Sequence, residues 1–425
     1  MNEEKFNYDL MDFIAMSPTP FHAVEQIVYK LECAGYQRLY EADSWQLEKQ
    51  QGYFVIRNDS SIIAFKLGED DVIDSGIQML GAHTDSPCLK VKPNAEIISQ
   101  SYLQLGVEVY GGALLNPWFD RDLSLAGRVS YVDDDGDLCH HLINFENAIA
   151  VIPSLAIHLD REANKNRSIN AQKDIPPVLM KLPNEDKPEF KKILLQFLQK
   201  DIDDAVEVLD YELSFYDVQE PAYVGLHQDF IASARLDNLL SCHVGLMAMT
   251  ETANPGSKML VCTDHEEVGS ASAVGAQGNF LSSVLKRIAG SVENFARMID
   301  HSMLISADNA HAVHPNYADK HDNNHGPIIN NGPVIKTNAN QRYASNSETS
   351  AIFQQLCKQA DVPVQSFVVR SDMACGSTIG PITASEIGIK TLDVGVPTFA
   401  MHSIRELAGR WDAWYLFRVL KEFYQ

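Results

Sequence analysis

Four short apolar runs in this 425-residue chain each lead into histidines or carboxylates. The runs cover residues 77–80, 259–262, 303–305 and 392–395, and the polar side chains that follow them are His83 with Asp85, Glu266 with Glu267, Asp308 and, after a short loop, His402. Such runs predict buried strands, and ligands of open α/β sheets bind beyond the carboxyl ends of strands. Imidazole and carboxylate groups gathered at one sheet edge would form a metal site. The pattern therefore predicts a metallohydrolase.

The pairs Glu266 with Glu267 and His83 with Asp85 suggest different roles for neighbouring side chains. Glu266 and Glu267 are adjacent, so one can bind a metal while the other takes a proton from the attacking water. Asp85 could accept a hydrogen bond from one ring nitrogen of His83, which fixes the tautomer of a metal-bound histidine. An exposed acidic loop and a structural histidine are the plainer interpretations. Gly269 and the small residues after it favour tight packing over an exposed loop.

Three further candidates can each be explained without a metal. Asp237 opens an apolar helix and suits a helix N-cap, whereas Asp308 suits a turn. His402 suits a cap or core position before a helix predicted over residues 404–408. From spacing alone, both interpretations of each residue stay open.

Two other clusters of polar residues give weaker indications of a site. The run Asp133-Asp134-Asp135-Gly136-Asp137 lacks the spacing and terminal glutamate of an EF-hand, so a hairpin turn is the better interpretation. Four histidines lie between residues 311 and 325, but proline and Asn/Asp residues deny this stretch a helical face. A second metal cluster there is not favoured.

Composition excludes several classes of function. The chain has 34 basic and 57 acidic side chains, for a net charge of -23, which disfavours nucleic-acid binding. Seven cysteines without a C-x-x-C pair argue against a disulfide framework and against a thiolate zinc site. The first residues lack the features of a signal peptide, and no apolar run is long enough to span a bilayer. We therefore expect a cytoplasmic protein.

The pattern of elements predicts an α/β domain interrupted by an insertion. A helix is predicted over residues 19–35, strands over 53–56 and 62–65, a helix over 193–198 and a final helix over 411–420. Between residues 94 and 231 the texture is largely strand-like, with a polar, proline-bearing tract at 165–204. We expect a discontinuous catalytic domain of residues 1–93 and 232–425, with 94–231 inserted.

Taken together, these motifs resemble the aspartyl aminopeptidase family of dinuclear zinc metallopeptidases. The resembling segments follow the family order over nearly the whole chain and are GAHTDSPCLKVKP from Gly81, LLNPWFDRDLSLAGR from Leu114, SLAIHLDR from Ser154, SARLDNL from Ser233, DHEEVGS from Asp264, SADNAHAVHPNY from Ser306, GPVIKTNANQRYA from Gly332, CGSTIGP from Cys375 and MHSIRELAG from Met401. One departure is that Ala374 precedes Cys375 where the family pattern has proline.

The resemblance implies a fold and a set of site residues. The fold is a three-layer α/β/α catalytic domain with an inserted β-rich oligomerisation domain, and the family typically forms a tetrahedral dodecamer. The implied ligands of two zinc ions are His83, Asp237, Glu267, Asp308 and His402, with Asp237 bridging. Glu266 resembles the general base, and Asp85 resembles the residue that orients His83. Nitrogen and oxygen donors without thiolate suit Zn²⁺ and tolerate Co²⁺ or Mn²⁺.

The resemblance also implies a substrate, namely peptides with N-terminal Asp, then Glu. An acidic protein needs a local cation to bind an acidic side chain, and Lys336, with Tyr343 nearby in sequence, is the candidate. His158 resembles the histidine that reaches a neighbouring subunit's active site, and it falls off an apolar helical stripe predicted over residues 152–159. A surface lysine and a surface histidine are the plainer interpretations.

Two other functions remain open at this stage. One is a broad-specificity dinuclear zinc aminopeptidase or a related amide hydrolase, such as a carboxypeptidase or a deacetylase. The other is a non-catalytic oligomeric scaffold that keeps the fold, although a scaffold would need none of the six candidate metal and base residues.

Overall fold

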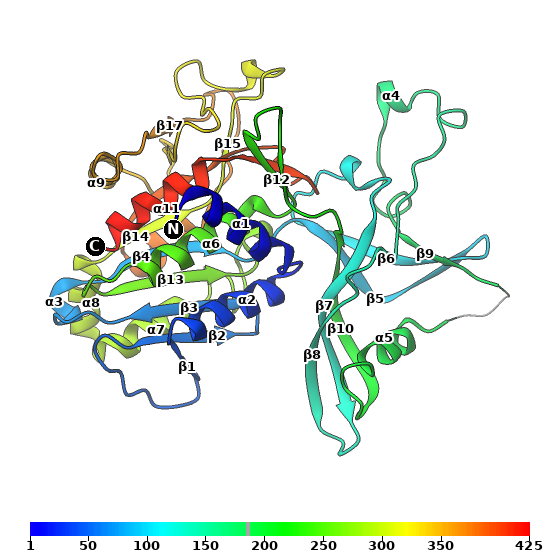
Figure 1. Ribbon diagram of the computed structural model, residues 1–425, viewed down its shortest axis with the longest axis horizontal. Coiled ribbons are helices and arrows are strands. Elements are labelled where there is room, and N and C mark those ends of the chain that lie inside the picture. Colours follow the sequence, from blue (N-terminus) through cyan, green and yellow to red (C-terminus); the bar gives the residue numbers. More distant parts are fainter. Residues whose placement is uncertain (184–187) are drawn as a thin grey trace. The chain divides into compact units, whose positions relative to one another are not determined.

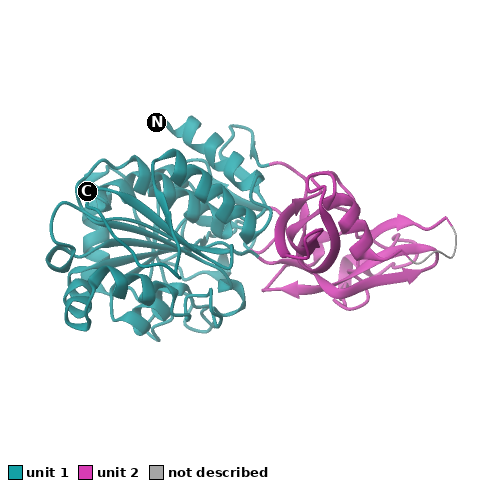
Figure 2. Cartoon of the chain, turned by 90° about the horizontal axis from the view of Figure 1, so that it is seen from below, with its two compact units in different colours: residues 1–86, 221–401, 406–425 teal, residues 87–220, 402–405 magenta. Residues whose placement is uncertain are grey.

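A computed structural model describes residues 1–183 and 188–425, and this part of the chain divides into two compact units (Figure 2). Unit 1 contains Met1–Ser86, Pro221–Met401 and Glu406–Gln425, whereas unit 2 contains Pro87–Glu220 and His402–Arg405. Unit 1 is the α/β part, and unit 2 is rich in strands. The predicted fold class, an α/β domain joined to a β-rich one, is confirmed.

The borders of the two units differ from the expected borders at 94 and 231. Strand β5 (Cys88–Ser99) pairs with strands of unit 2, so the residues just before 94 belong to that sheet. Strands β11 (Ala222–Val224) and β12 (Phe230–Ser233) instead pair within a sheet of unit 1. Strand pairing with distant segments sets these borders, and local composition does not reveal it.

Nine strands of the described residues form the main sheet of unit 1 (Figure 1). In spatial order they are β1 (Gln37–Leu39), β2 (Gly52–Arg57), β3 (Ser61–Lys66), β13 (Lys258–Thr263), β4 (Gln78–His83), β14 (Met303–Ala307), β18 (Lys390–Gly395), β16 (Val334–Lys336) and β17 (Gln365–Phe367). Strands β13, β4, β14 and β18 are parallel neighbours. They are the four strands that the apolar runs predicted, and their carboxyl ends therefore reach the same edge.

Helices cover both faces of this sheet, because side chains alternate along each strand. Leu260 and Cys262 of β13 join one apolar core, and Met259 and Val261 join the other. The first face is covered by α1 (Glu3–Ala15), α2 (Pro20–Cys33), α6 (Leu236–Glu251), α9 (Ser347–Gln359) and α11 (Asp412–Phe423), and the second by α3 (Val72–Ser75), α7 (Phe280–Ala289), α8 (Val292–His301) and α10 (Ile379–Ile387). Helices α2 and α11 confirm the helices expected over 19–35 and 411–420, whereas α1, which precedes α2, was not expected from the sequence.

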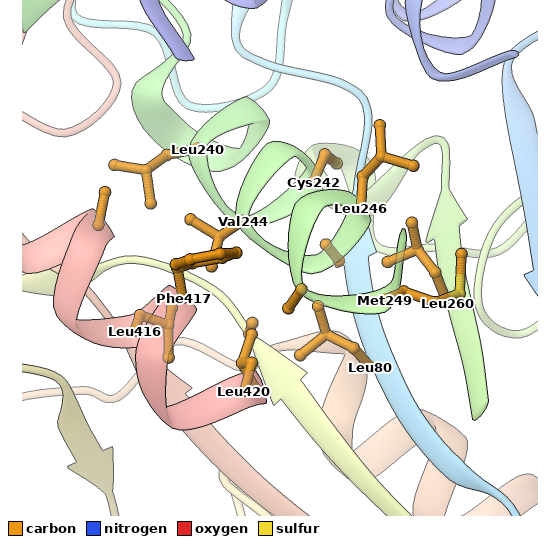
Figure 3. Close-up of a cluster of buried hydrophobic side chains, with 14 of the residues drawn as sticks. Leu80, Leu240, Cys242, Val244, Leu246, Met249, Leu260, Leu416, Phe417 and Leu420 are labelled. Carbon is orange, nitrogen blue, oxygen red and sulfur yellow. The ribbon is translucent and has the colours of Figure 1, made fainter. Parts of the chain in front are cut away.

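Helix α6 packs especially close to the sheet (Figure 3). A Cβ at Gly245 would lie 2.0 Å from Leu80 Cδ2 and 2.9 Å from Leu260 Cδ1, so a larger residue would require these buried leucine side chains to shift. On its other side Val244 packs against α11, whose Phe417 belongs to the same core. This close packing sets the distance between α6 and the sheet. Asp237 lies at the start of this helix.

A smaller sheet of unit 1 contains five strands of the described residues. In spatial order they are β11, β12, β20 (Glu406–Gly409), β19 (Pro397–Phe399) and β15 (Ala310–His311). The helix expected over residues 404–408 is therefore wrong, because β20 pairs with β12 and β19 instead. Pairing on both sides satisfies its backbone polar groups without a helix.

Unit 2 is built on an antiparallel sheet of six strands within the described residues. Its spatial order is β8 (Leu138–Asn144), β7 (Leu123–Asp133), β10 (Ala205–Asp217), β5, β6 (Tyr102–Tyr110) and β9 (Val178–Lys181). Helix α5 (Phe190–Leu198) buries Phe190 and Leu194 in the core of this unit, as its predicted pattern required. A short helix, α4 (Ala163–Asn166), lies in the polar tract, of which residues 184–187 are outside the described part.

Two local expectations in unit 2 have opposite outcomes. The acidic run at 133–137 is the hairpin turn between β7 and β8, as predicted. The helix expected over residues 152–159 is wrong, because this segment contains neither helix nor strand. Its apolar side chains Leu155, Ile157 and Leu159 are exposed. They therefore do not form the buried face that an amphipathic helix needs.

In the two described stretches, 1–183 and 188–425, every helix is too short or too polar to cross a lipid bilayer.

Candidate metal centre

The carboxyl ends of three neighbouring parallel strands bring the candidate ligands of unit 1 together. His83 is the last residue of β4, Asp308 directly follows β14, and Glu266 and Glu267 open a 3-10 turn just after β13. Asp237 comes from the first turn of α6. Four segments that lie far apart in sequence therefore deliver their polar groups to one place.

Strand β18 contributes by approaching the backbone next to Asp308. The Asp308 N–H donates to the carbonyl of Val394 at 3.0 Å. A Cβ at Gly395 would lie 2.1 Å from the Asp308 carbonyl oxygen, so glycine permits this approach. Strand β18 thereby helps to fix the position of Asp308.

The orientation of His83 follows from the partners of its Nδ1 atom. Nδ1 lies 3.0 Å from the Asp85 carbonyl oxygen and 3.3 Å from Asp85 Oδ1. Both are acceptors, so Nδ1–H donates, and in the neutral ring Nε2 carries the lone pair. Nε2 lies 3.7 Å from Asp237 Oδ1, 3.8 Å from Asp308 Oδ1 and 4.0 Å from Glu266 Oε2. The imidazole thus presents to three carboxylates a nitrogen that is able to bind a metal.

Asp85 also holds the loop that carries the two glutamates. Its Oδ1 accepts from the Glu266 N–H at 3.1 Å, and its Oδ2 accepts from the Glu267 N–H at 3.0 Å. The Asp85 side chain is buried, so these hydrogen bonds are shielded from water. The Asp85 carboxylate therefore orients His83 and also fixes the backbone of both glutamates. The sequence predicted only the first of these roles.

Within unit 1 the donor atoms form two overlapping groups that could hold a cation. One contains His83, Glu266 and Glu267, and the other contains His83, Asp237 and Asp308. In each group the ligand atoms lie within 4.8 Å of one another. The donors are imidazole nitrogen and carboxylate oxygen, a set that fits Zn²⁺ and also accepts Co²⁺ or Mn²⁺.

The carboxylates of this cluster are difficult to ionise together. Burial, with the negative charge of Asp308 and Asp237, raises the pKa of Glu266 to about 7 even though the His83 ring lowers it. Burial and the charge of Asp237 raise the pKa of Glu267 to about 10. A divalent cation would compensate this buried negative charge, so the electrostatics fit a metal site as well as the donor chemistry does.

Unlike the two glutamates, His83 and Asp308 are stabilised in their charged forms. Burial would lower the pKa of His83, but hydrogen bonds to Asp308 and Asp85 and the charge of Glu266 raise its pKa well above the ordinary value. Burial would raise the pKa of Asp308, but the ammonium of Lys336 and the imidazole of His83 hold this pKa below its usual range.

Lys336 is buried next to the metal cluster, which excludes its interpretation as a surface lysine. Its side chain is 3% exposed, and its Nζ lies 3.5 Å from Asp308 Oδ2. Nζ also lies 5.5 Å from the centroid of the Tyr343 ring. Tyr343 is buried too, and this burial, with the neighbouring Cys375 thiol, raises its pKa. The structure therefore brings these two predicted residues together beside a candidate ligand.

Two of the predicted site residues, His402 and His158, lie in unit 2. His402 follows Met401 of unit 1 in the chain, and its Nδ1 lies 3.3 Å from the carbonyl oxygen of Gly112. A carbonyl can only accept, so the lone pair of the neutral ring is on Nε2. His158 is exposed in the irregular segment described above. Their roles as ligand and as substrate-binding residue stay predictions.

The structure decides between several of the plainer interpretations. Asp237 lies in a kink at the start of α6, where its backbone and that of Asn238 are non-helical, so it stands just before the regular part of the helix. His402 does not precede a helix, because β20 follows it. In the described ranges, the groups able to hold a metal include none of the histidines between 311 and 325, and His325 contacts Asp322 at 2.7 Å instead.

The sequence did not single out the side chains that hold the Asp237 segment in place. Ser86 Oγ donates to the Asp237 carbonyl at 2.6 Å, and Glu406 Oε2 accepts from the Asp237 N–H at 2.9 Å. Asn238 Nδ2 donates to the Ala307 carbonyl at 2.8 Å. These contacts join residues far apart in the chain, so only the folded structure reveals them.

Comparison with known proteins identifies the family. The family model described as "Aminopeptidase I zinc metalloprotease (M18)" matches residues 13–424. The chain belongs to the aminopeptidase I (M18) family of zinc metalloproteases. This is the family that the sequence motifs resemble, so that resemblance is confirmed. As a member of it, the protein is a zinc-dependent aminopeptidase, a peptide hydrolase.

Relatives of this M18 protein agree over their whole length. A "Probable M18 family aminopeptidase 2" from Ectopseudomonas mendocina (strain ymp) is 60% identical over 422 residues, which cover 99% of this chain and 98% of the relative. A protein of the same description from Pseudomonas aeruginosa (strain UCBPP-PA14) is 58% identical over 421 residues, again covering 99% and 98%. The match therefore includes both units.

Solved structures support the same fold. A chain of the "Cryo-EM structure of the Ape4 and Nbr1 complex" superimposes with a TM-score of 0.95 at 38% identity, covering 99% of this chain and 86% of that one. A chain of the "Structure of S. cerevesiae mApe1 dodecamer" gives a TM-score of 0.85 at 27% identity, covering 99% and 96%.

The raised pKa values predict that the metal-free protein loses stability as the pH rises from about 5 to 8. Glu266 and Glu267 have folded-state pKa values above their ordinary 4.5, and His83 has one above 6.5, so the folded state binds more protons than the unfolded state in this range. Thermal unfolding of metal-depleted protein at several pH values measures this. A Glu267→Gln variant, whose amide cannot titrate, should show a shallower fall. An equally steep fall in that variant would contradict the assignment.

Proposed function

We propose that this M18 aminopeptidase removes N-terminal acidic residues, Asp and then Glu, from peptides with a pair of zinc ions. His83, Asp237, Glu267, Asp308 and His402 would hold these ions. The observation that carries the proposal is the convergence of buried imidazole and carboxylate donors at adjacent strand ends. His402 is included because its Nδ1 faces a carbonyl, which leaves Nε2 as the metal-binding nitrogen.

The residues of the chain supply proton transfer beside these ions. When bound, the zinc ions polarise the scissile carbonyl and lower the pKa of the attacking water. Glu266 takes the proton of that water and returns it to the leaving amine. Burial raises its pKa to about 7 in the metal-free protein, and bound cations would lower this pKa and favour the ionised form that accepts a proton. Asp85 fixes this glutamate through its backbone N–H.

Exchanging each of the two adjacent glutamates for glutamine should separate their roles. Glu266→Gln should lower kcat by about 10²–10⁴-fold while zinc content stays at the wild-type level, because only proton transfer is lost. Glu267→Gln should lower zinc content as well as activity. Steady-state kinetics with metal analysis on both variants measures this. A Glu266→Gln protein that keeps wild-type kcat would rule out the proposed general base.

The proposed preference for acidic residues rests on Lys336. Its ammonium is buried beside Asp308 and over the Tyr343 ring, where a charge-assisted hydrogen bond contributes about 1.5–3 kcal/mol. A substrate carboxylate that reaches this cation would be attracted locally, in spite of the net charge of -23. The Tyr343 hydroxyl would form part of the same pocket wall.

Removing this cation should change specificity more than turnover in general. Lys336→Ala should lower kcat/KM for peptides with N-terminal Asp by about 10–150-fold, the equivalent of one charge-assisted hydrogen bond, and should affect Leu peptides much less. A kinetic panel of peptides with N-terminal Asp, Glu, Leu and Lys, together with N-acetylated peptides, measures this.

Lys258 provides a matched control, because it is also buried but contacts the Thr252 carbonyl at the end of α6. Lys258→Met should leave the ratio of Asp to Leu peptides unchanged. Equal losses on both peptides in Lys336→Ala would favour the broad-specificity aminopeptidase instead. Cleavage of the N-acetylated peptides would favour a related amide hydrolase.

We also propose that the protein is a homo-oligomer in which His158 contacts the active site of a neighbouring subunit. The support is the exposure of Leu155, Ile157 and Leu159 around His158, since clustered exposed apolar side chains usually mark an interface. The S. cerevesiae mApe1 relative is described as a dodecamer.

Sedimentation analysis should show an assembly much larger than the 47.3 kDa chain. A mixture of inactive His158→Ala and Glu266→Gln subunits, once dissociated and reassembled together, should regain part of the activity, because some interfaces then combine an intact His158 with an intact Glu266. A monomeric protein, or no recovery in the reassembled mixture, would contradict the role of His158.

A further inference from the structure

Helix α6 begins with a kink at Asp237 and Asn238, whose backbone angles are non-helical. The N-cap position is Arg235, which has a left-handed backbone with φ of 58° and makes no side-chain capping hydrogen bond. The first N–H groups of a helix have no partner within the helix and need one from elsewhere. Here the Asp237 N–H donates to Glu406 Oε2 at 2.9 Å, from a residue 169 positions away in sequence.

The β-sheet register places Glu406 at this helix start. Strand β20 pairs with β12 so that Glu406 lies opposite Ser233, the last residue before the short connection into α6. Glu406 is 1% exposed. Because Asp237 has non-helical backbone angles, its N–H depends on this acceptor from a distant strand, and a buried N–H that loses its acceptor is costly.

The backbone carbonyl of Asp237 also accepts a hydrogen bond. Ser86 Oγ donates to this carbonyl oxygen at 2.6 Å, and Ser86 directly follows Asp85, three residues after His83 at the end of β4. The backbone of Asp237 is therefore fixed at both its N–H and its C=O. Its side chain points toward His83, with Oδ1 3.7 Å from Nε2. A shift of this backbone would move the carboxylate within the donor cluster.

We propose that Glu406 is a positioning residue of the metal centre, which holds the Asp237 backbone so that the Asp237 carboxylate stays within reach of the same cation as His83 and Asp308. The inference rests on the proposed role of Asp237 as a ligand. Residues that support metal ligands in this indirect way typically change metal affinity by about 10–100-fold when they are mutated.

The test compares zinc affinity with stability in full-length, metal-depleted protein. Zinc affinity is measured by competition with a chromophoric chelator, and stability by thermal unfolding without metal. The variants are Glu406→Ala, which removes the acceptor, and Glu406→Gln, which keeps an amide oxygen of similar reach. The control is Glu3→Ala, because Glu3 is also buried and accepts from Asn7 and Arg410, outside the donor cluster.

Glu406→Ala should weaken zinc binding by about 10–100-fold, and Glu406→Gln should weaken it less. Glu3→Ala should lower the unfolding temperature without changing zinc affinity. The role of Glu406 is overturned if Glu406→Ala binds zinc within twofold of the wild type, or if Glu3→Ala weakens binding as much. An Asp237→Asn variant with wild-type zinc affinity would instead overturn the ligand set itself, and the role of Glu406 with it.

Discussion

The central constraint on this structure is that it gathers several carboxylates in a largely buried cluster. Asp85, Asp237, Glu266, Glu267 and Asp308 surround one buried imidazole. Burial and the charges of neighbouring carboxylates raise the pKa of both glutamates. Such a cluster persists only when backbone N–H groups, neighbouring cations or bound metal ions compensate the charge. The folding energy of other parts of the domain must hold these groups together.

Two features of the fold provide that restraint. Parallel pairing of β13, β4 and β14 fixes the strand ends, and glycine at position 245 allows α6 to lie close above them. Side chains then connect the segments, since Asp85 accepts from the glutamate loop and Glu406 accepts from the α6 start. Each connection joins residues far apart in the chain. The ligands are thus positioned by their backbone as well as by their rotamers.

Specificity and chemistry share one electrostatic network in this arrangement. The ammonium of Lys336 compensates Asp308, and the same cation is the candidate partner of an acidic substrate side chain. In the proposed arrangement, an acidic residue bound at Lys336 and a metal bound at Asp308 would influence each other through this ion pair. A strongly acidic protein that acts on acidic peptides needs such a local cation, because its long-range field repels the substrate.

The sequence by itself determined the donor types, the four central strands and the helices at 20–33 and 412–423, because short apolar runs and helical periodicity are local signals. It failed at β20 and at residues 152–159, where a helical pattern was present but strand pairing or missing core contacts decided the conformation. Only the tertiary structure decided that Lys336 is buried and that Glu406 accepts from Asp237. Those contacts depend on which distant segments pack together, and no local pattern encodes that choice.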